Sequence, residues 1–197
     1  MTLDSKSFFG LAAAIAGFIQ YAPYMGDIVK GKTRPHAFSW FVWGLPCFIV
    51  FAAQFYEGGA AGSWATAVTG FLCTVVFVLA LFYGERKITR LDWISLFTAI
   101  AAIGWWVAIK DPLGSVVLIT VIDIIGFIPT IRKSVDKPHE ETMSTYIVGA
   151  LKWVLSLCAF STISLTVWLY PVAMVVANGL FAIMLHMWRS SLVIKRN

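Results

Sequence analysis

Seven long apolar segments dominate the sequence, and each is close to the length that an α-helix needs to cross a bilayer. They cover residues 8–29, 38–55, 63–84, 92–109, 113–131, 143–161 and 166–188. A membrane-spanning helix needs about 20 mostly apolar residues. Hydrophobic residues make up 59% of the chain and charged residues 13%, which leaves too little polar surface for a soluble domain. The sequence therefore predicts an all-α membrane protein with seven transmembrane helices.

Basic residues lie almost entirely on one side of the predicted spans. The loops after the first, third and fifth spans, and the tail after the seventh, contain Lys30, Lys32, Arg34, Arg86, Lys87, Arg90, Arg132, Lys133, Lys137, Arg189, Lys195 and Arg196. The other side has Lys6 and Lys110. Because short loops rich in Lys and Arg stay in the cytoplasm, we expect the N-terminus outside and the C-terminus in the cytoplasm, in the plasma (inner) membrane. The net charge of +5 is thus an orientation signal, and no nucleic-acid partner is expected.

Two segments of the chain are similar to each other. Residues 20–45 read QYAPYMGDIVKGKTRPHAFSWFVWGL, and residues 126–151 read GFIPTIRKSVDKPHEETMSTYIVGAL. Each has a Pro late in an apolar helix, a basic loop with Pro-His, and an aromatic residue one to three positions before a Gly. Duplication of this kind in a membrane protein usually indicates two halves around a central pathway.

The duplicated halves predict a division of the chain. If the first three and last three spans are the two copies, each copy begins outside and ends inside, so the copies are parallel and one further span must restore the direction. We therefore expect two parallel three-helix bundles joined by an inverting linker helix, a 3+1+3 arrangement. Its parts are a first bundle at 1–90, the linker at 91–111, and a second bundle with a short basic tail at 112–197.

This arrangement, with Pro23 and Pro129 late in the first helix of each bundle, resembles the PQ-loop superfamily, which includes the SWEET (MtN3/saliva) transporters. The chain diverges at the dipeptide that names the family, because Tyr24 and Thr130 stand where the family has Gln. The resemblance implies a carrier that moves a small polar solute, by default a sugar, by alternating access. It also implies that Pro23, Pro46 and Pro129 act as hinges; the alternative for each is a static kink.

The same resemblance points to two polar residues in the third helix of each bundle. SWEET-type sites bind their solute with an Asn followed by Gly, and Asn178 precedes Gly179 in the last span. The equivalent position in the third span is Thr69, before Gly70. The resemblance implies that Asn178 and Thr69 bind the solute. The alternative is helix packing, because both dipeptides let helices approach closely and form hydrogen bonds across an interface.

Asp123 and Lys152 are ionisable residues well inside predicted spans. A charge at mid-depth costs at least about 2.5–3.5 kcal/mol, so both side chains should face protein or water. Counted from the basic loop at 1.5 Å per residue, both lie about 13 Å deep and Asn178 about 16 Å deep. We expect Asp123 and Lys152 to form a buried pair at the solute cavity. In this hypothesis Asp123 accepts a proton during transport. The alternative is an ion pair that only links two helices.

Three further residues are candidates for the cavity wall. Gln20 lies about 15 Å from the basic end of the first span, at the depth of the charged pair. Trp43 and Trp153 flank the repeat-related Gly44 and Gly149. The alternative for Gln20 is an interhelical hydrogen bond, and for each Trp it is ordinary packing.

Asp27 and Lys133 occupy related positions one helical turn beyond Pro23 and Pro129. We expect these two opposite charges to meet as an inner gate on the basic side. The alternative is that both are solvated at the membrane surface.

The sequence has no nucleophile paired with a base, no cluster of metal ligands and no Gly-rich phosphate loop, so we expect no catalysis, metal or cofactor. The expected partners are a small-molecule solute and the lipid bilayer, and transport would be passive or proton-coupled. Two alternatives are a receptor-like ligand-binding protein on the same fold and an accessory protein for an envelope-lipid enzyme. With both bundles on one chain, we expect a monomer to be able to enclose a complete pathway, and a homo-oligomer is also compatible with the sequence.

Overall fold

The computed structural model describes residues 4–90, 92–94, 96–97, 100–101, 104 and 111–194. Its long helices are α1 (Ser5–Val29), α2 (Ala37–Tyr56), α3 (Trp64–Tyr83), α5 (Pro112–Asp136), α6 (Met143–Ala159) and α7 (Leu165–Ile194). Two short 3-10 helices, η1 (Ala60–Ser63) and η2 (Pro138–Glu140), lie in loops. The described residues contain no strand, so the all-α prediction is confirmed. The predicted linker, 91–111, lies mostly outside the described residues; within it, 92–94, 96–97, 100–101 and 104 are helical.

Local signals set several helix ends close to where the apolar segments predict them. The carboxylate of Asp4 accepts a hydrogen bond of 2.9 Å from the backbone N–H of Ser7 and caps α1. Asp111 does the same for α5 through the N–H of Gly114, at 2.7 Å. Such caps satisfy N–H groups that the first turn leaves free. Just beyond the end of α1, Gly31 has φ +69°, a left-handed conformation that glycine adopts without strain.

Within the part of the chain that the structure describes, four helical segments are long and apolar enough to cross a membrane: Ser5–Val29, Ala37–Tyr56, Ala60–Tyr83 and Leu165–Ser191. Met143–Ala159 is a shorter apolar helix. Large apolar side chains such as Phe18, Phe71 and Leu180 are exposed on the outer surface. A soluble monomer rarely exposes so much apolar surface, whereas a protein surface in contact with lipid tails is apolar. The helices and this surface support the prediction of an integral membrane protein.

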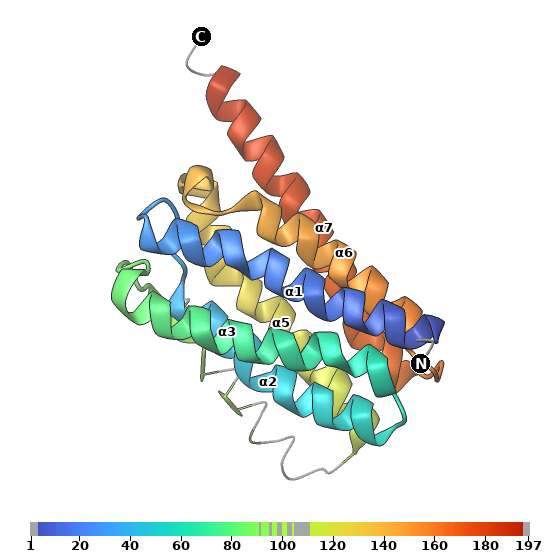
Figure 1. Cartoon of the computed structure of the whole chain (residues 1–197). Helices are drawn as coiled ribbons and strands as arrows, with labels where there is room; N and C mark the ends of the chain where they lie inside the picture. The colour runs from blue at the N-terminus through green and yellow to red at the C-terminus, as the bar shows by residue number, and fades with distance from the viewer. Residues whose placement is uncertain are drawn as a thin grey trace.

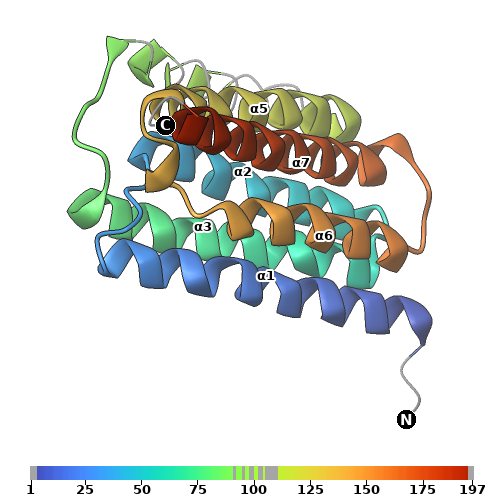
Figure 2. The ribbon, with the colours of Figure 1, turned by 90° about the horizontal axis from the view of Figure 1, so that it is seen from above.

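The long helices of the described residues form a closed ring through their contacts, and they lie beside one another along the length of the molecule (Figures 1 and 2). Going around it, α1 packs against α3, α3 against α2, α2 against α5, α5 against α7, α7 against α6, and α6 against α1. The contacts α1–α6 and α2–α5 join helices from the first half of the chain to helices from the second half. The ring therefore has an interior to which both halves contribute.

The basic loops gather at one end of the ring, which we call the basic end. There the backbone N–H of Arg34 donates to the carbonyl of Glu140 at 3.3 Å, and the N–H of Glu85 donates to the carbonyl of Pro35 at 3.0 Å. Arg189, near the end of α7, donates to the carbonyl of Pro138 at 3.0 Å. Helix α1 begins at the opposite end of the bundle (Figure 2), and the last turns of α7 project away from the other helices (Figure 1). The predicted clustering of basic loops on one face is therefore present.

Two large groups of buried apolar side chains form most of the core of the described residues, and Val42 and Ile122 form a third, small group. One is rich in aromatic rings and includes Tyr24, Trp40, Trp43, Phe127 and Phe181. The other includes Val50, Ile119, Trp153, Tyr170 and Met174. Members of both groups line the cavity described below, so the cavity interrupts the core between them.

The three prolines predicted as hinges lie within helices that continue past them. Pro23 is inside α1, Pro46 inside α2 and Pro129 inside α5, and α7 contains a further proline, Pro171. A Pro inside a helix removes one backbone hydrogen bond and weakens the helix at that point. Motion about these prolines stays a prediction.

Candidate solute-binding cavity

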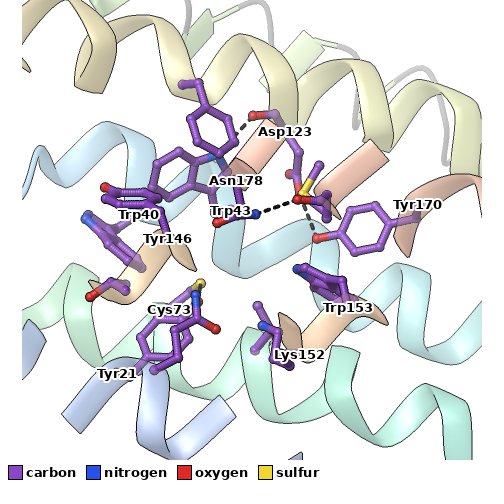
Figure 3. Close-up of a pocket in the computed structure, with 15 residues that line it drawn as sticks. Tyr21, Trp40, Trp43, Cys73, Asp123, Tyr146, Lys152, Trp153, Tyr170 and Asn178 are labelled. Carbon is purple, nitrogen blue, oxygen red and sulfur yellow. Dashed lines mark hydrogen bonds between the residues drawn. The ribbon is translucent and has the colours of Figure 1, made fainter. Parts of the chain in front are cut away.

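A cavity of about 40 Å³ lies inside the ring, and side chains from all six long helices line it. Its wall includes all seven residues for which the sequence predicted a binding role: Gln20, Trp43, Thr69, Asp123, Lys152, Trp153 and Asn178 (Figure 3). The volume has room for about three water molecules. That these side chains bind a solute stays a prediction; that they surround one cavity is a feature of the fold.

Lys152 is fully buried in the middle of α6. Its ammonium donates a hydrogen bond of 2.7 Å to the hydroxyl of Thr69 on α3. The same nitrogen lies 4.3 Å from the ring centroid of Trp153 and 5.7 Å from that of Tyr21. Aromatic faces attract cations within about 6 Å, so the charge is stabilised by one hydroxyl and two rings.

Asp123 on α5 is also buried, with 1% of its surface exposed. Its Oδ2 accepts a hydrogen bond of 2.7 Å from the hydroxyl of Tyr170. Its backbone carbonyl accepts one of 2.9 Å from the indole N–H of Trp43. The other carboxylate oxygen, Oδ1, is buried and has no hydrogen-bond partner in the structure. One half of this carboxylate is therefore held in place, while the other half is unsatisfied.

The predicted ion pair between Asp123 and Lys152 is wrong. Both residues line the cavity, but the ion pairs among the described residues do not include this one, and the two side chains lie apart in Figure 3. Each side chain finds a neutral partner on another helix instead: Asp123 on α5 pairs with Tyr170 on α7, and Lys152 on α6 reaches across the ring to Thr69 on α3. The sequence gives the depth of each residue, but it does not give the direction in which each helix turns its side chains.

Gln20 and Asn178 lie against α6 at Gly149. A Cβ atom added to Gly149 would lie 2.6 Å from Nε2 of Gln20 and 2.9 Å from Oδ1 of Asn178, which is too close for any real side chain. Asn178 donates to the carbonyl of Met174 at 2.8 Å, whereas Oε1 of Gln20 has no partner. The glycine therefore makes the space that both amides occupy at the cavity wall.

The two predicted tryptophans position other groups as well as lining the cavity. Trp43 packs on Phe127, with ring centroids 4.8 Å apart, and a Cβ on Gly126 would lie 2.7 Å from its Nε1. Trp153 meets Tyr170 edge to face, with centroids 5.2 Å apart and planes at 90°. Both Asp123 partners, Trp43 and Tyr170, are thus fixed by aromatic packing.

Sequence reasoning missed Glu141, which lies in the loop before α6 and is 2% exposed. Its carboxylate forms a buried ion pair with Lys133. It also accepts hydrogen bonds from the hydroxyls of Tyr24 at 3.2 Å and Tyr146 at 2.9 Å. We call these four residues the Glu141 cluster. Tyr146 also lines the cavity, so the cluster reaches from the basic end to the cavity wall.

The predicted gate between Asp27 and Lys133 is also wrong. Lys133 pairs with Glu141, and it donates to the carbonyl of Arg34 at 2.7 Å. Asp27 accepts a hydrogen bond of 2.9 Å from the hydroxyl of Thr142. An acid in a polar loop is usually solvated, and only the fold of the loop turns Glu141 inward, so the sequence contains little signal for this pairing.

A second buried charge at the basic end ties the start of the linker to α5. The carboxylate of Asp92 accepts a hydrogen bond of 2.8 Å from Arg132, and Nε2 of His36 lies 3.4 Å from the same carboxylate. His36 immediately precedes α2, and its imidazole is fully buried. Burial lowers the pKa of His36, and the nearby Asp92 carboxylate opposes part of that shift. Burial of the imidazole therefore favours its neutral form.

Among the described residues, no group of three His, Cys, Asp or Glu side chains is placed to hold a metal ion. Comparisons of the chain with protein-family models, with curated proteins and with solved structures found no match. The cavity and the arrangement of the helices around it are therefore the observations that bear on function.

Proposed function

We propose that this protein is a membrane carrier that moves a small polar solute by alternating access, passively or together with a proton. The observation that carries the proposal is a cavity lined by Asp123, Lys152 and Asn178 inside a ring of apolar helices. Charged and amide groups inside a membrane protein are costly, and they usually mark a pathway or a binding site. Resemblance to the SWEET transporters makes a sugar the default solute.

The order of helices around the ring supports the 3+1+3 arrangement. Exchanging α1 with α5, α2 with α6 and α3 with α7 leaves the set of neighbouring pairs around the ring unchanged. For example, the contact between α1 and α6 becomes the contact between α5 and α2. Two parallel bundles, at 1–90 and 112–197, would produce this symmetry if the linker at 91–111 restores the chain direction. The same symmetry favours membership of the PQ-loop superfamily.

In this proposal the structure is a closed state, because polar contacts seal both ends of the ring. The Glu141 cluster joins α1, α5 and α6 at the basic end. At the other end, Thr66 donates to Gln54 at 2.7 Å, and Ser156 donates to the carbonyl of Gly62 at 3.0 Å. Alternating access requires the two sets to open in turn. Pro23, Pro46 and Pro129 supply weak points at which α1, α2 and α5 can bend.

The orientation of the carrier follows from the basic end. Loops rich in Lys and Arg are retained in the cytoplasm, so we propose that the basic end faces the cytoplasm and that the N-terminus lies outside, in the plasma (inner) membrane. Lys6, near the start of α1, donates to the carbonyl of Ser161 at 3.4 Å at the opposite end. A reporter enzyme fused to either terminus tests this assignment.

The carrier proposal is tested with purified protein in sealed vesicles. Uptake of labelled sugars, amino acids and organic acids is measured, with empty vesicles and vesicles that contain Lys152→Gln as controls. The proposal predicts saturable uptake of at least one solute by the parent protein and a strong loss of uptake in the variant. A solute that binds without crossing the membrane would indicate a receptor. An effect on lipid composition without solute flux would indicate an accessory protein for lipid synthesis.

A further inference from the structure

The two charges in the cavity differ from the other buried charges of the protein. At the basic end, buried carboxylates have charged partners: Glu141 pairs with Lys133, and Asp92 pairs with Arg132. In the cavity, Lys152 and Asp123 are also buried, yet neither belongs to an ion pair among the described residues. Removing charges from water without pairing them is unfavourable. Two ionisable groups of opposite type therefore face the cavity without an ion-pair partner.

The cavity wall also has donors and acceptors that make no hydrogen bond in the structure. An ammonium group has three N–H donors, and that of Lys152 makes one hydrogen bond, to Thr69. Among acceptors, Oδ1 of Asp123 and Oε1 of Gln20 are buried without a partner. A buried polar atom normally has a partner. The wall thus offers donors with positive charge at Lys152 and acceptors with negative charge at Asp123.

We propose that the cavity binds a zwitterion, a small solute with one carboxylate and one protonated primary amine, as in an amino acid. The carboxylate would accept hydrogen bonds from Lys152, and the amine would donate to Oδ1 of Asp123. This inference rests on the proposed function, because it takes the cavity to be the solute site. A zwitterion compensates both charges and brings no net charge into the apolar ring.

Other solute classes leave part of the wall unsatisfied. A neutral sugar supplies hydroxyl groups but no charge, so both ions would stay uncompensated. An amine or a carboxylate alone would compensate one of them. A quaternary ammonium has no N–H group and cannot satisfy the Oδ1 acceptor of Asp123. The small volume of the cavity, about 40 Å³ in this closed state, favours short side chains.

Water is the competing occupant, because about three water molecules would fit and could bridge the two charges. Bridging water needs no particular solute, so it predicts no preference among solutes by charge. The zwitterion predicts a preference for solutes that carry both groups. Comparing solutes of the same skeleton separates these two cases.

The first experiment measures thermal stabilisation of the purified, full-length protein. The probes are the common L-amino acids, glycine and β-alanine, each over a concentration series. For L-alanine, propionate lacks the amine and ethylamine lacks the carboxylate; glucose is the neutral probe. We expect at least one amino acid to stabilise the protein, with its one-charge analogues binding at least tenfold more weakly. Stabilisation by no amino acid, or equal binding of the one-charge analogues, overturns the inference.

The second experiment asks whether each charge recognises its own end of the solute. Asp123→Asn should reduce the contribution of the amine, so that an amino acid and its carboxylate-only analogue bind alike. Lys152→Gln should reduce the contribution of the carboxylate, so that an amino acid and its amine-only analogue bind alike. A purely structural role would weaken all probes in parallel, and that result would overturn the inference. Lys137→Gln, which removes a half-exposed charge outside the cavity, is the matched control. If a variant does not fold, the analogue series on the parent protein still decides.

Flux measurements keep this inference separate from the carrier proposal. Selective binding of an amino acid without uptake into vesicles would contradict the carrier and leave the zwitterion site intact. Uptake of a sugar, with no binding or uptake of amino acids, would leave the carrier intact and overturn the zwitterion site.

Discussion

The Lys152 ammonium donates a hydrogen bond of 2.7 Å to the hydroxyl of Thr69, and this contact joins α6 to α3 at the cavity. The hydroxyl of Thr69 uses its own hydrogen on the carbonyl of Ala65, at 2.6 Å. Its lone pairs are therefore left to face the ammonium. A residue from the first half of the chain thus holds a charge from the second half.

Thr69→Val should destabilise the protein by about 1–3 kcal/mol, because a buried ammonium loses its hydrogen-bond acceptor at nearly constant side-chain volume. Thr69→Ser keeps the hydroxyl and should cost less. The free energy of unfolding in detergent, measured by chemical denaturation, checks the difference. A smaller loss for Val than for Ser would mean that the methyl group of Thr69 contributes more than its hydrogen bond to Lys152.

Tyr170→Phe and Asp123→Asn should show energetic coupling. The hydroxyl of Tyr170 donates to Oδ2 of Asp123, and hydrogen bonds to charged groups contribute about 1.5–3 kcal/mol. A double-mutant cycle on the free energy of unfolding should therefore give an interaction energy of about 0.5–3 kcal/mol. Tyr83→Phe changes an exposed tyrosine and serves as the control. Additive effects of Tyr170→Phe and Asp123→Asn would show that the hydrogen bond contributes nothing.

Removal of the buried ion pair at the basic end should open a path to the cavity. Glu141→Gln alone leaves the Lys133 charge unpaired and should cost about 3–5 kcal/mol, whereas Lys133→Met with Glu141→Gln should cost less. Cys73 lines the cavity and is 1% exposed. In the double variant, a membrane-impermeant maleimide added from the basic side should label Cys73, which the parent protein protects.

The labelling experiment needs a background in which Cys73 is the remaining cysteine, made with Cys47→Ala and Cys158→Ser. Lys137→Gln is the control at the same end, because the side chain of Lys137, which pairs with Glu85, is half exposed, and ion pairs that reach solvent contribute about 0.2–1 kcal/mol. Labelling of Cys73 in this control, or protection of Cys73 in the double variant, would rule out the Glu141 cluster as the seal.

Gly149→Ala should displace two amides from the cavity wall. Its Cβ would lie within 3 Å of both Gln20 and Asn178, and overpacking of this kind costs about 1–3 kcal/mol. Solute binding should weaken as well. Gly179→Ala is the matched control, since no atom lies within 4 Å of its added Cβ; alanine there should be neutral, or stabilising by up to about 1 kcal/mol. A larger loss at 179 than at 149 contradicts this description of the wall.

Acidification should destabilise the protein through His36. Because its pKa in the folded protein is lowered by burial, the unfolded chain binds the proton more readily. The stabilisation is complete above the unfolded pKa of about 6.5 and is lost as the pH falls through the lower, folded value. The charged groups around the imidazole are Asp92, Arg132 and Lys133. Unfolding temperatures between about pH 7 and pH 5 should fall more steeply for the parent than for His36→Gln; identical slopes would contradict this.

The sequence alone was enough for every property that depends on distance along a helix. Apolar runs of sufficient length predict where the helices of the described residues begin and end, to within a few residues at most ends. A constant rise per residue predicts which polar groups share a depth. For that reason, Asp123, Lys152, Asn178 and Gln20 were expected in one layer, and all four line one cavity.

Tertiary structure decided every property that depends on rotation of the helices and on which helices are neighbours. The sequence places Asp123 and Lys152 at equal depth, but packing turns Asp123 toward Tyr170 and Lys152 toward Thr69. Packing likewise pairs Lys133 with Glu141 rather than with Asp27. The depth of a residue follows from its position along one helix. The partner of its side chain depends on two helices, because it is set by how the side chains of the whole ring pack together.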